Sequence, residues 1–326
     1  MGAFTMPSLG ADMDVGTVTR WLVRPGDTVH RGDVVAVVDT EKSEIEVEVF
    51  EDGTVAELVV PEGREVPVGT VLARIAPAPA AAGPGSASAP ASPAPEVSGP
   101  GAAEDRTARL RHAVGSLVAR SKREIPHYYL ATTIDLSRAR AWLDDVNASR
   151  PVTGRLVMSA LLLAATARAV AAVPEVNGTF TAGAFTASPS VHLGVAISLR
   201  GGGLVVPAIR EAQDRTLDEL LATLRDLVGR ARTGVLRASD LAGPTLTVTN
   251  LGDRGVDLVH GVIFPPQVAL VGFGRVAERP MVADGQVVAR TAVTATLAAD
   301  HRVSDGRRGG RYLAEIDRLL QRPDEL

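Results

Sequence analysis

Short runs of alternating hydrophobic and polar residues fill the first 76 positions, and Pro/Gly turns separate them. Such runs predict β-strands. The pattern occurs twice, because a shift of 37 positions superimposes one copy on the other without a gap. The matched pairs are Gly16 and Gly53, Val18 and Val55, Val23 and Val60, Gly26 and Gly63, Val29 and Val66, Gly32 and Gly69, and Val34 and Val71. Two such copies predict a quasi-twofold β-sandwich in which each half covers the apolar face of the other.

Lys42 lies between the two copies. Ile45, Val47 and Val49 follow it and alternate with glutamates, which predicts a strand that begins just after Lys42. We therefore expect Lys42 at the tip of a hairpin, pointing into water beside acidic neighbours.

Residues 77–103 break the alternation. They consist almost wholly of Ala, Pro, Gly and Ser, with Glu96 as the single charge. Such a segment cannot bury enough apolar surface to fold, and its prolines favour extended conformations. At about 3.1 Å per residue the segment would reach roughly 80 Å. We interpret it as a disordered, flexible linker between a small domain, residues 1–76, and a larger one, residues 104–326.

In residues 104–326 the apolar residues also recur with a longer spacing, which is typical of helices. Helical spacing of apolar residues occurs at 106–123, at 156–173 and in a segment that Asp214 or Thr216 would cap. Segment 156–173 is Ala-rich and contains Arg168, so it predicts a buried helix rather than a membrane span. Strands are predicted at 191–199, 204–209, 245–249, 268–274 and 287–298. This mixture predicts an α/β domain with a mixed sheet.

The composition excludes several kinds of chemistry. The chain has no cysteine, which excludes disulfides, thiolate metal sites and a cysteine nucleophile. The net charge of −4 does not favour nucleic acid as a partner. Residues 1–14 lack a basic segment followed by an apolar run, so we expect no signal peptide, no membrane association and a cytoplasmic location.

Lysine is rare in this chain. Lys42 and Lys122 are the two lysines among 34 basic residues, and the others are arginines. A guanidinium replaces an ammonium wherever a positive charge is enough, but it does not form a stable amide. Lys42 is therefore a candidate for cofactor attachment, while scarcity alone fits an ordinary surface lysine equally well.

Two motifs at predicted strand ends offer catalytic groups. His301 directly follows the 287–298 strand region in Asp300-His301-Arg302-Val303-Ser304-Asp305-Gly306, and Asp305 comes four residues later. Imidazole titrates near neutral pH, and a nearby carboxylate can fix its tautomer, as general-base catalysis requires. Thr249, in Thr249-Asn250-Leu251-Gly252, offers a hydroxyl that can donate to an oxyanion. The spacing alone also fits a loop histidine and ordinary turn chemistry.

Taken together, these motifs resemble the dihydrolipoamide acyltransferase (E2) component of 2-oxo acid dehydrogenase complexes. Residues 4–76 look like a lipoyl domain, with Met6-Pro7-Ser8-Leu9-Gly10 and Thr40-Glu41-Lys42-Ser43 as its motifs. In that family the lysine carries lipoate, and Glu41 stands where Asp is usual. Biotin domains have methionines on both sides of the lysine, so Glu41 and Ser43 argue against biotin.

The resemblance continues through the larger domain and ends on the complete D-H-R-x-x-D-G motif at residues 300–306. The other matching segments are Ile125-Pro126-His127, Pro174-Glu175-Val176-Asn177, Gly203-Leu204-Val205-Val206-Pro207, Thr249-Asn250-Leu251-Gly252 and Pro265-Pro266-Gln267. The resemblance implies a multidomain protein. An all-β lipoyl-type (hammerhead) sandwich would be linked to an α/β catalytic domain like that of chloramphenicol acetyltransferase.

The resemblance also implies an activity, which is acyl transfer between a dihydrolipoyl thiol and coenzyme A. His301 would take the proton from the attacking thiol, and Thr249, where many relatives have Ser, would donate to the oxyanion. Asp305 would orient the loop or pair with an arginine. In the family the active site lies between subunits of a trimer, which can form larger cores, and different chains contribute the histidine and the hydroxyl.

One domain of the family is missing from the sequence. Relatives carry a small helical domain that binds 2-oxo acid dehydrogenase (E1) or dihydrolipoamide dehydrogenase (E3), and segment 104–124 is too short for it. The expected partners would then be recruited without it. Two alternative functions stay open: a non-catalytic lipoyl-bearing scaffold, which the presence of His301 and Asp305 disfavours, and an acyltransferase for a free small molecule, which a tethered carrier disfavours.

Overall fold

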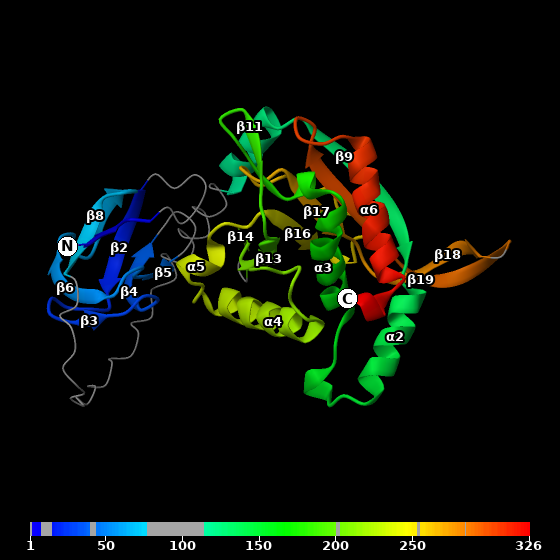
Figure 1. The fold of residues 1–326 in the computed structure, drawn as a ribbon, viewed down its shortest axis with the longest axis horizontal. Helices are drawn as coiled ribbons and strands as arrows, with labels where there is room; N and C mark the ends of the chain where they lie inside the picture. Colours follow the sequence, from blue (N-terminus) through cyan, green and yellow to red (C-terminus); the bar gives the residue numbers. More distant parts are fainter. Residues whose placement is uncertain are drawn as a thin grey trace. The chain divides into compact units, whose positions relative to one another are not determined.

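The computed structural model describes residues 2–7, 15–39, 44–76, 114–199, 203–252, 255–283 and 285–326. Contacts between residues divide the chain into two compact units, essentially before and after residue 113. Figure 1 shows an all-β N-terminal unit and an α/β C-terminal unit. Each unit is described by itself.

The N-terminal unit is a sandwich of two four-stranded sheets, with orders β1-β8-β6-β3 and β5-β4-β2-β7. Its strands are β1 (Gly2–Thr5), β2 (Val15–Trp21), β3 (Thr28–Val29), β4 (Val34–Asp39), β5 (Glu44–Glu48), β6 (Gly53–Leu58), β7 (Arg64–Pro67) and β8 (Val71–Ala76). The predicted β-sandwich is confirmed.

The 37-residue repeat governs how these sheets are built. A shift by 37 residues carries β2, β3 and β4 onto β6, β7 and β8, so the paired strands β4 and β2 of one sheet correspond to the paired strands β8 and β6 of the other. The register irregularity between Val18 and Arg20 recurs between Val55 and Glu57. Strand β3 of the first copy pairs with β6 of the second, while β7 of the second pairs with β2 of the first. The two copies therefore interlock, and neither forms a complete sheet alone.

The repeat also places the core and the turns. Paired positions of the two copies are buried between the sheets. These buried pairs are Val18 and Val55, Val29 and Val66, Val35 and Leu72, and Val38 and Ile75. Gly26 and Gly63 have φ values of 100° and 79°, which residues with a Cβ rarely adopt. This requirement explains why glycine occupies the turn in both copies.

The C-terminal unit contains a mixed seven-stranded sheet in the order β15-β12-β16-β17-β19-β18, with β9 also paired to β19. Its strands are β9 (His127–Asp135), β12 (Leu193–Val195), β15 (Ala208–Ile209), β16 (Leu246–Asn250), β17 (Ala269–Phe273), β18 (Ala277–Ala283) and β19 (Gln286–Asp300). β12, β16 and β17 run parallel to one another, whereas β9, β17 and β18 are antiparallel to β19. Two small pairs lie outside the sheet, β10 (Gly178–Thr181) with β11 (Ala184–Ala187) and β13 (Ile197–Ser198) with β14 (Leu204–Val205).

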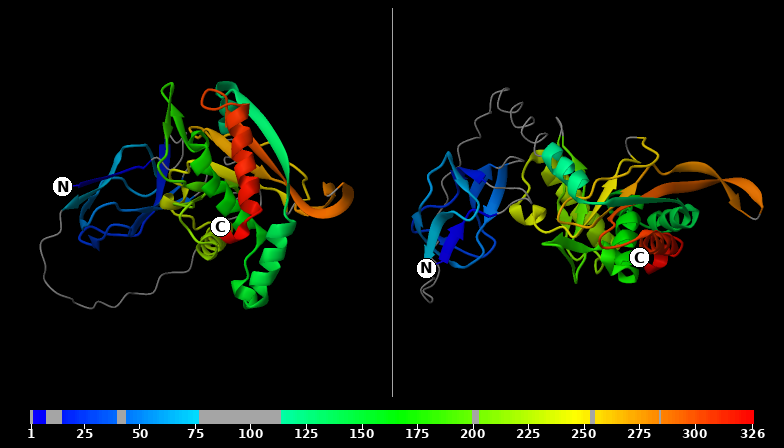
Figure 2. Two further views of the ribbon diagram at one scale, coloured as in Figure 1. Left: turned by 45° about the vertical axis from the view of Figure 1, so that its right-hand side comes forward. Right: turned by 90° about the horizontal axis from the view of Figure 1, so that it is seen from above.

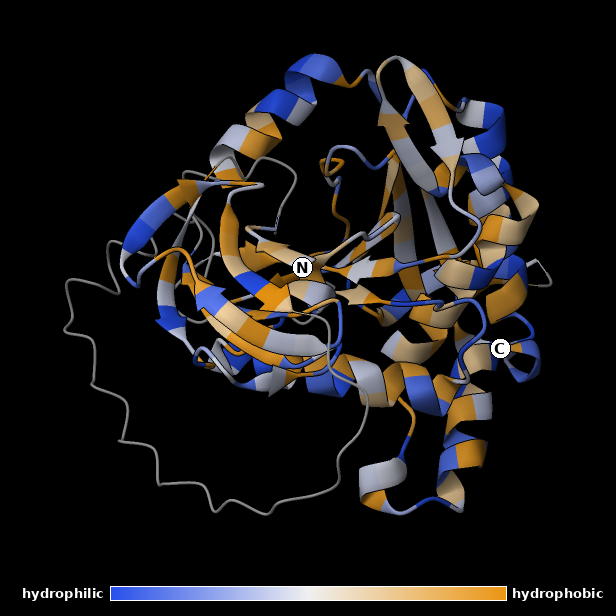
Figure 3. Cartoon of the chain, turned by 60° about the vertical axis from the view of Figure 1, so that its left-hand side comes forward, coloured by the Kyte–Doolittle hydropathy of each residue, from blue (hydrophilic) through white to orange (hydrophobic). Residues whose placement is uncertain are grey.

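Helices pack against one face of this sheet, and the two views in Figure 2 show α6 running along β9. Their bounds are α2 (Ser137–Ala148), α3 (Met158–Ala169), α4 (Leu217–Thr233), α5 (Ala238–Leu241) and α6 (Gly306–Leu320), with short 3₁₀ turns at Val152–Gly154, Val170–Ala172, Pro174–Val176 and Pro323–Glu325. Residues 114–124 are also helical. Figure 3 shows hydrophilic and hydrophobic segments alternating along the outer helices, as expected for helices that bury one face.

Helix α3 is the buried helix predicted from the sequence. Nine of its twelve residues are buried. By length and composition the stretch Val152–Ala172 could also cross a membrane, but 61% of its apolar window is buried inside the protein. Burial of this kind is what the core helix of a globular unit shows.

The predicted elements are largely present, with some differences. The helix after residue 214 is α4, and Thr216 rather than Asp214 caps it, because Thr216 and Glu219 exchange hydrogen bonds in a capping box. The expected strands at 191–199 and 204–209 are each split into two short strands. Strand β19 extends beyond its predicted bounds. The sequence did not predict β9, α2, β18 or α6.

Candidate functional site

His301 follows β19 directly, at the start of the turn that leads into α6. Its backbone N–H donates to the carbonyl of Pro126 at 3.0 Å, which ties the turn to the start of β9. The carbonyl of Asp300 accepts hydrogen bonds from the N–H groups of Val303 and Ser304, both at 3.0 Å. The backbone around His301 is therefore held from both sides, and the side chain is exposed at the end of the sheet.

Asp300 and Arg302 reinforce this turn. The Asp300 side chain is fully buried, and both of its oxygens accept from the Arg302 guanidinium at distances between 2.7 and 3.1 Å. The guanidinium also lies over the ring of Phe180, 4.0 Å from its centroid. A bidentate carboxylate–guanidinium pair is among the strong, well-oriented contacts in proteins. It therefore fixes the residues on either side of His301.

Tyr128 packs against the imidazole. The rings of Tyr128 and His301 meet edge to face, with centroids 5.2 Å apart. The Tyr128 hydroxyl shares a hydrogen bond of 2.8 Å with Ser304 Oγ, and burial raises the pKa of Tyr128. A Cβ on Gly309 would lie 2.9 Å from the Tyr128 hydroxyl, so α6 packs closely beneath this ring. Sequence reasoning missed Tyr128 and Ser304, although Ser304 lies in the motif at residues 300–306 and Tyr128 directly follows Ile125-Pro126-His127.

Asp305 caps helix α6. Its carboxylate accepts from the backbone N–H of Arg308 at 2.9 Å. Hydrogen bonds from the backbone N–H groups of Arg308 and Arg307, together with the charges of Arg308 and His301, hold the pKa of Asp305 below its usual value. The guanidinium of Arg302, in the same turn, pairs with Asp300 and not with Asp305. Of the two roles considered for Asp305, its contacts correspond to orienting the loop.

His127 begins β9, directly opposite Asp300 on β19. Its Nδ1 donates to the Ile125 carbonyl at 2.9 Å, and its Nε2 accepts from the Ile263 N–H at 3.1 Å. Burial lowers the pKa of His127. With both ring nitrogens engaged as a neutral imidazole, His127 has a structural role.

Thr249 lies near the end of β16, in the centre of the sheet. It is opposite Gly272 on β17, which in turn is opposite Thr296 on β19. His301 is five residues beyond Thr296, and five residues of a strand span about 16 Å. The spacing from β16 to β17 and the spacing from β17 to β19 add to this distance. Thr249 and His301 of one chain are thus too far apart to act on one reacting group.

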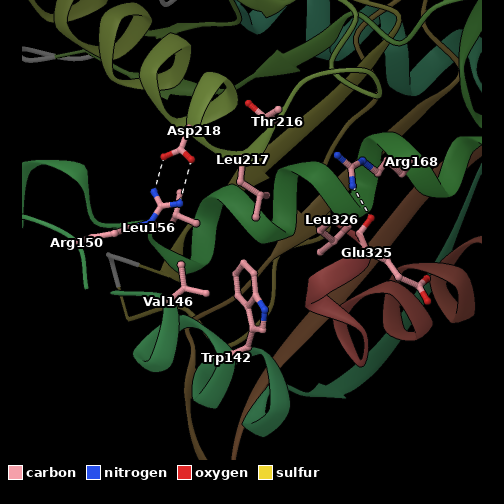
Figure 4. Close-up of a pocket in the computed structure, with 10 residues that line it drawn as sticks. All are labelled: Trp142, Val146, Arg150, Leu156, Arg168, Thr216, Leu217, Asp218, Glu325 and Leu326. Atoms are coloured by element: carbon pink, nitrogen blue, oxygen red, sulfur yellow. Dashed lines mark hydrogen bonds and ion pairs between the residues drawn. The ribbon is translucent and has the colours of Figure 1, made fainter. Parts of the chain in front are cut away.

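A separate cavity of about 430 Å³ lies among α2, α3, α4 and the C-terminal segment. It is lined by Trp142, Val146, Arg150, Leu156, Arg168, Thr216, Leu217, Asp218, Glu325 and Leu326 (Figure 4). Its two arginines already have partners, since Arg150 pairs with Asp218 and Arg168 donates to the carbonyls of Glu325 and Arg215. None of the sequence-predicted site residues lines this cavity.

The remaining predicted site residue, Lys42, lies outside the described residues. The flanking strands β4 and β5 pair with each other, with Asp39 opposite Glu44. This pairing brings Asp39 and Glu44, the residues that flank segment 40–43, opposite each other. Among the residues that the structure describes, no group of three or more potential metal ligands occurs.

Two sequence families match this chain. The family described as 2-oxoacid dehydrogenases acyltransferase (catalytic domain) matches residues 101–326, and the family described as biotin-requiring enzyme matches residues 2–75. Fold, site motifs and these matches agree, and the chain belongs to the 2-oxoacid dehydrogenase acyltransferase family.

Several relatives align along nearly the whole chain. The dihydrolipoyllysine-residue acetyltransferase component of the pyruvate dehydrogenase complex of Rickettsia felis is 25% identical, covering 98% of this chain and 97% of its own. The lipoamide acyltransferase component of the branched-chain alpha-keto acid dehydrogenase complex of Bacillus subtilis is 27% identical, covering 98% and 97%.

Solved structures resemble the C-terminal unit. The dihydrolipoamide acetyltransferase of Azotobacter vinelandii is 28% identical with a TM-score of 0.63, covering 67% of this chain and 90% of its own. The probable dihydrolipoamide acetyltransferase of Listeria monocytogenes is 28% identical with a TM-score of 0.60, covering 65% and 92%.

Proposed function

We propose that this protein is an E2-type acyltransferase that moves an acyl group from a dihydrolipoyl thiol to coenzyme A. Lipoate would be attached to Lys42 as an amide. The observation that carries the proposal is the His301 turn, in which backbone hydrogen bonds, the Asp300–Arg302 pair and the ring of Tyr128 hold the surroundings of the imidazole, in a chain of this family. A fixed imidazole at a strand end is suited to general-base catalysis.

The proposed reaction uses this chain's residues for proton transfer and charge stabilisation. His301 takes the proton from the coenzyme A thiol, and the resulting thiolate sulfur attacks the carbonyl carbon of the acyl-dihydrolipoyl thioester. Thr249 donates its hydroxyl proton as a hydrogen bond to the oxyanion that forms. When the tetrahedral species collapses, the bond from carbon to the lipoyl sulfur breaks, and that sulfur recovers the proton from His301.

A relative supports the choice of residues. The catalytic mechanism of the Azotobacter vinelandii enzyme has been investigated at a serine, a histidine and an asparagine. That serine precedes the histidine by 52 residues, and the asparagine follows it by four. Thr249, His301 and Asp305 have the same spacing in this chain. The hydroxyl group is kept as threonine, and the asparagine position holds the carboxylate that caps α6.

The distance between Thr249 and His301 supports a site shared by two subunits. Because the register of the sheet separates the two side chains by more than 16 Å, a complete site needs His301 from one copy and Thr249 from another. We infer a homotrimer, alone or as the unit of a larger core. A relative of this catalytic unit forms the cubic core of the pyruvate dehydrogenase multienzyme complex.

Mixed oligomers test the shared site. His301→Ala and Thr249→Ala are each expected to be nearly inactive in acyl transfer from free dihydrolipoamide thioester to coenzyme A. Co-expression should restore up to about one quarter of wild-type activity, because random mixing creates interfaces that hold both intact groups. Separately expressed variants mixed without subunit exchange are the control. Absence of any restoration in verified mixed oligomers would contradict the shared site.

The carrier role has its own test. Intact-mass analysis of the protein from a lipoylating host should show the mass increment of lipoate, and Lys42→Arg should lack it. Lys122→Arg is the matched control, since it removes the other lysine and should keep the increment. An unmodified wild type would contradict the carrier role.

We further propose a cytoplasmic multienzyme complex in which residues 77–103 tether the lipoyl domain and E1 and E3 are the partners. The Rickettsia felis relative aligns over 402 positions, more than the 326 residues of this chain, so it contains segments that this chain lacks. E1 and E3 would then bind surfaces of this protein other than the small helical domain that relatives carry. A pull-down with E1 and E3 from the same source tests this, and the scaffold alternative predicts binding without acyl transfer by the purified protein.

A further inference from the structure

Lys122 is the lysine that the proposed function leaves without a role. Only Lys42 and Lys122 are lysines among the 34 basic residues of the chain. With lipoate attached to Lys42, Lys122 would carry the one free ε-amino group of this protein. An ε-amine forms a stable amide with an acyl group, whereas a guanidinium does not. The surroundings of Lys122 therefore matter in a protein that handles acyl thioesters.

The amine of Lys122 contacts a tyrosine. Lys122 lies in the last turn of the helix at residues 114–124, where its Nζ donates to the Tyr129 hydroxyl and lies 4.8 Å from the centroid of the Tyr129 ring. This ring stacks on His127 and meets His260 edge to face, with centroids 5.8 and 5.4 Å apart. These contacts hold the phenol beside the amine, while Lys122 and Tyr129 both stay exposed.

No carboxylate neutralises this amine among the residues that the structure describes. Glu124, the acidic residue nearest to Lys122 in the sequence, pairs with Arg120 at 3.2 Å. Burial lowers the pKa of His127, and the positive charge of Lys122 adds to this effect. An ammonium in an ion pair loses that pair when it loses its proton. The ammonium of Lys122 has no such pair to lose.

The hydrogen bond to Tyr129 suits both protonation states of the amine. A phenol oxygen accepts hydrogen bonds, and the ammonium and the neutral amine both have N–H donors. The contact therefore survives loss of the proton, and it leaves the lone pair of the neutral nitrogen free to react. The neutral amine is the nucleophilic form of lysine. Tyr129 thus orients a nucleophile without blocking it.

Lys122 lies just before the segment that holds the His301 turn. The Ile125 N–H donates to the Ser121 carbonyl at 2.9 Å, which continues the helix into this segment. Pro126 then accepts the His301 N–H at 3.0 Å. The end of the helix and the proposed general base are therefore joined through a short, hydrogen-bonded stretch of backbone.

The sheet places the same amine on the face that bears Thr249. Ala131 on β9 is opposite Thr296, which is in the row that contains Thr249. Alternate residues of a strand share one face, so Tyr129 lies on this face as well. The Lys122 amine, bound to Tyr129, is thus on the side of the sheet where the proposed oxyanion forms.

We propose that Lys122 is an acyl-modification site that takes acyl groups from the protein's own thioesters. The nitrogen lone pair attacks the carbonyl carbon of an acyl thioester, the bond from carbon to sulfur breaks, and the thiolate takes the proton that the nitrogen releases. The products are an Nε-acyl-lysine amide and a free thiol. This inference rests on the proposed function, which supplies acyl-dihydrolipoyl and acyl-coenzyme A thioesters. The amide leaves no charge over the Tyr129 ring.

Peptide mass spectrometry of the full-length protein tests the site. Incubation with acetyl-coenzyme A, followed by hydroxylamine to cleave thioesters, should leave an acetyl group on Lys122, and Lys122→Arg should lack it. Arg138→Lys is the matched control, because it adds a lysine at an exposed position of α2, beyond the other end of β9. Within this variant Lys122 should be acetylated at least about tenfold faster than the added lysine, because its amine is oriented near the site.

Tyr129→Phe tests the phenol. The ring stays and the hydrogen bond is lost, so acetylation of Lys122 should slow about three- to tenfold. Acyl transfer to coenzyme A and the melting temperature should not change. Equal acetylation rates at Lys122 and at the added lysine, or an unchanged rate in Tyr129→Phe, would overturn the proposal and leave Lys122 an ordinary surface lysine.

Lys42→Arg identifies the acyl donor. Slower acetylation of Lys122 in this variant would assign the donor as the tethered acyl-dihydrolipoyl thioester, and an unchanged rate would assign it as acetyl-coenzyme A. Both results support the site.

Failure of the site and failure of the proposed function give different results. If the wild type transfers no acyl group to coenzyme A while Lys122 is still acetylated faster than the added lysine, the proposed function fails and the modification site stands. If transfer is normal and the two lysines are acetylated equally, the site fails and the function stands.

Discussion

The two ends of strand β19 are built in opposite ways. At its C-terminal end, the His301 turn has hydrogen-bonded partners for Asp300, Arg302 and Asp305, and the imidazole packs on Tyr128. Near its N-terminal end, Arg279 and Arg290 face each other with unused donors. A group that transfers protons must be oriented before substrate arrives. The contacts at the C-terminal end of β19 meet this requirement, and those near its N-terminal end leave two guanidinium donors without a partner among the described residues.

The largest effect is expected from His301→Ala. Loss of the general base should reduce kcat by about 10²- to 10⁴-fold. Steady-state kinetics measure this loss. His30→Ala, an exposed histidine of the N-terminal unit, is the control. Near-normal turnover of His301→Ala would remove His301 from the mechanism.

Thr249→Ala should reduce kcat by about 10²-fold, the usual effect of removing one oxyanion donor. Thr249→Ser keeps the hydroxyl and should retain most activity. Equal activity of the Ala and Ser variants would show that the hydroxyl takes no part.

Tyr128→Phe should lower kcat about three- to tenfold without changing KM, because the ring stays but its hydrogen bond to Ser304 is lost. Ser304→Ala should have the same effect, and the double variant should be no worse than either single one. Tyr129→Phe is the control, since the Tyr129 hydroxyl contacts Lys122 instead. Additive losses would show that the two hydroxyls act independently and not through their shared hydrogen bond.

Gly309→Ala tests the packing beneath this turn. The new methyl group would lie 2.8 Å from Leu130 Cδ1 and 2.9 Å from the Tyr128 hydroxyl, so it should lower the free energy of unfolding by about 1–3 kcal/mol. Gly310→Ala is the matched control, because nothing lies within 4 Å of its added Cβ. Chemical denaturation of both variants measures the difference, and equal stability would contradict the tight contact.

The smallest effect is expected for the dependence of stability on pH through His127. The pKa of His127 is lowered from 6.5 in the folded protein. Below pH 6.5 the unfolded chain therefore takes up a proton that the folded chain does not, and stability falls as the pH falls. His127→Gln should have a shallower decrease of melting temperature between pH 7 and pH 5. A slope equal to that of the wild type would contradict this role of His127.

How far the sequence alone leads depends on the kind of pattern that each element has. The 37-residue repeat predicted the N-terminal sandwich because its period and its turn glycines are visible without any contact. Strand β9 was missed because most of its side chains are half-buried or exposed, which blurs the alternation. Helix α6 was missed because its first turns contain Gly306, Gly309 and Gly310, which disfavour a helix unless packing requires them.

The candidate site was predictable only as separate motifs. His301 and Asp305 were found from one segment, and Thr249 from another. Their separation depends on the register of β16, β17 and β19, which no local pattern contains. The arginine pair was hidden for the same reason, because Arg279 and Arg290 become neighbours only through hairpin pairing.

The interlocking of β3 with β6 and β7 with β2 has a consequence for biosynthesis and turnover. Removing any one copy would take strands out of both sheets at once, so no half-folded form of the N-terminal unit can bury its core. During synthesis the N-terminal unit should fold in a single step, only after residue 76 has emerged from the ribosome. A protease cut within either copy should abolish both sheets together. Lipoate attachment at Lys42, as proposed above, should then depend on an intact N-terminal unit.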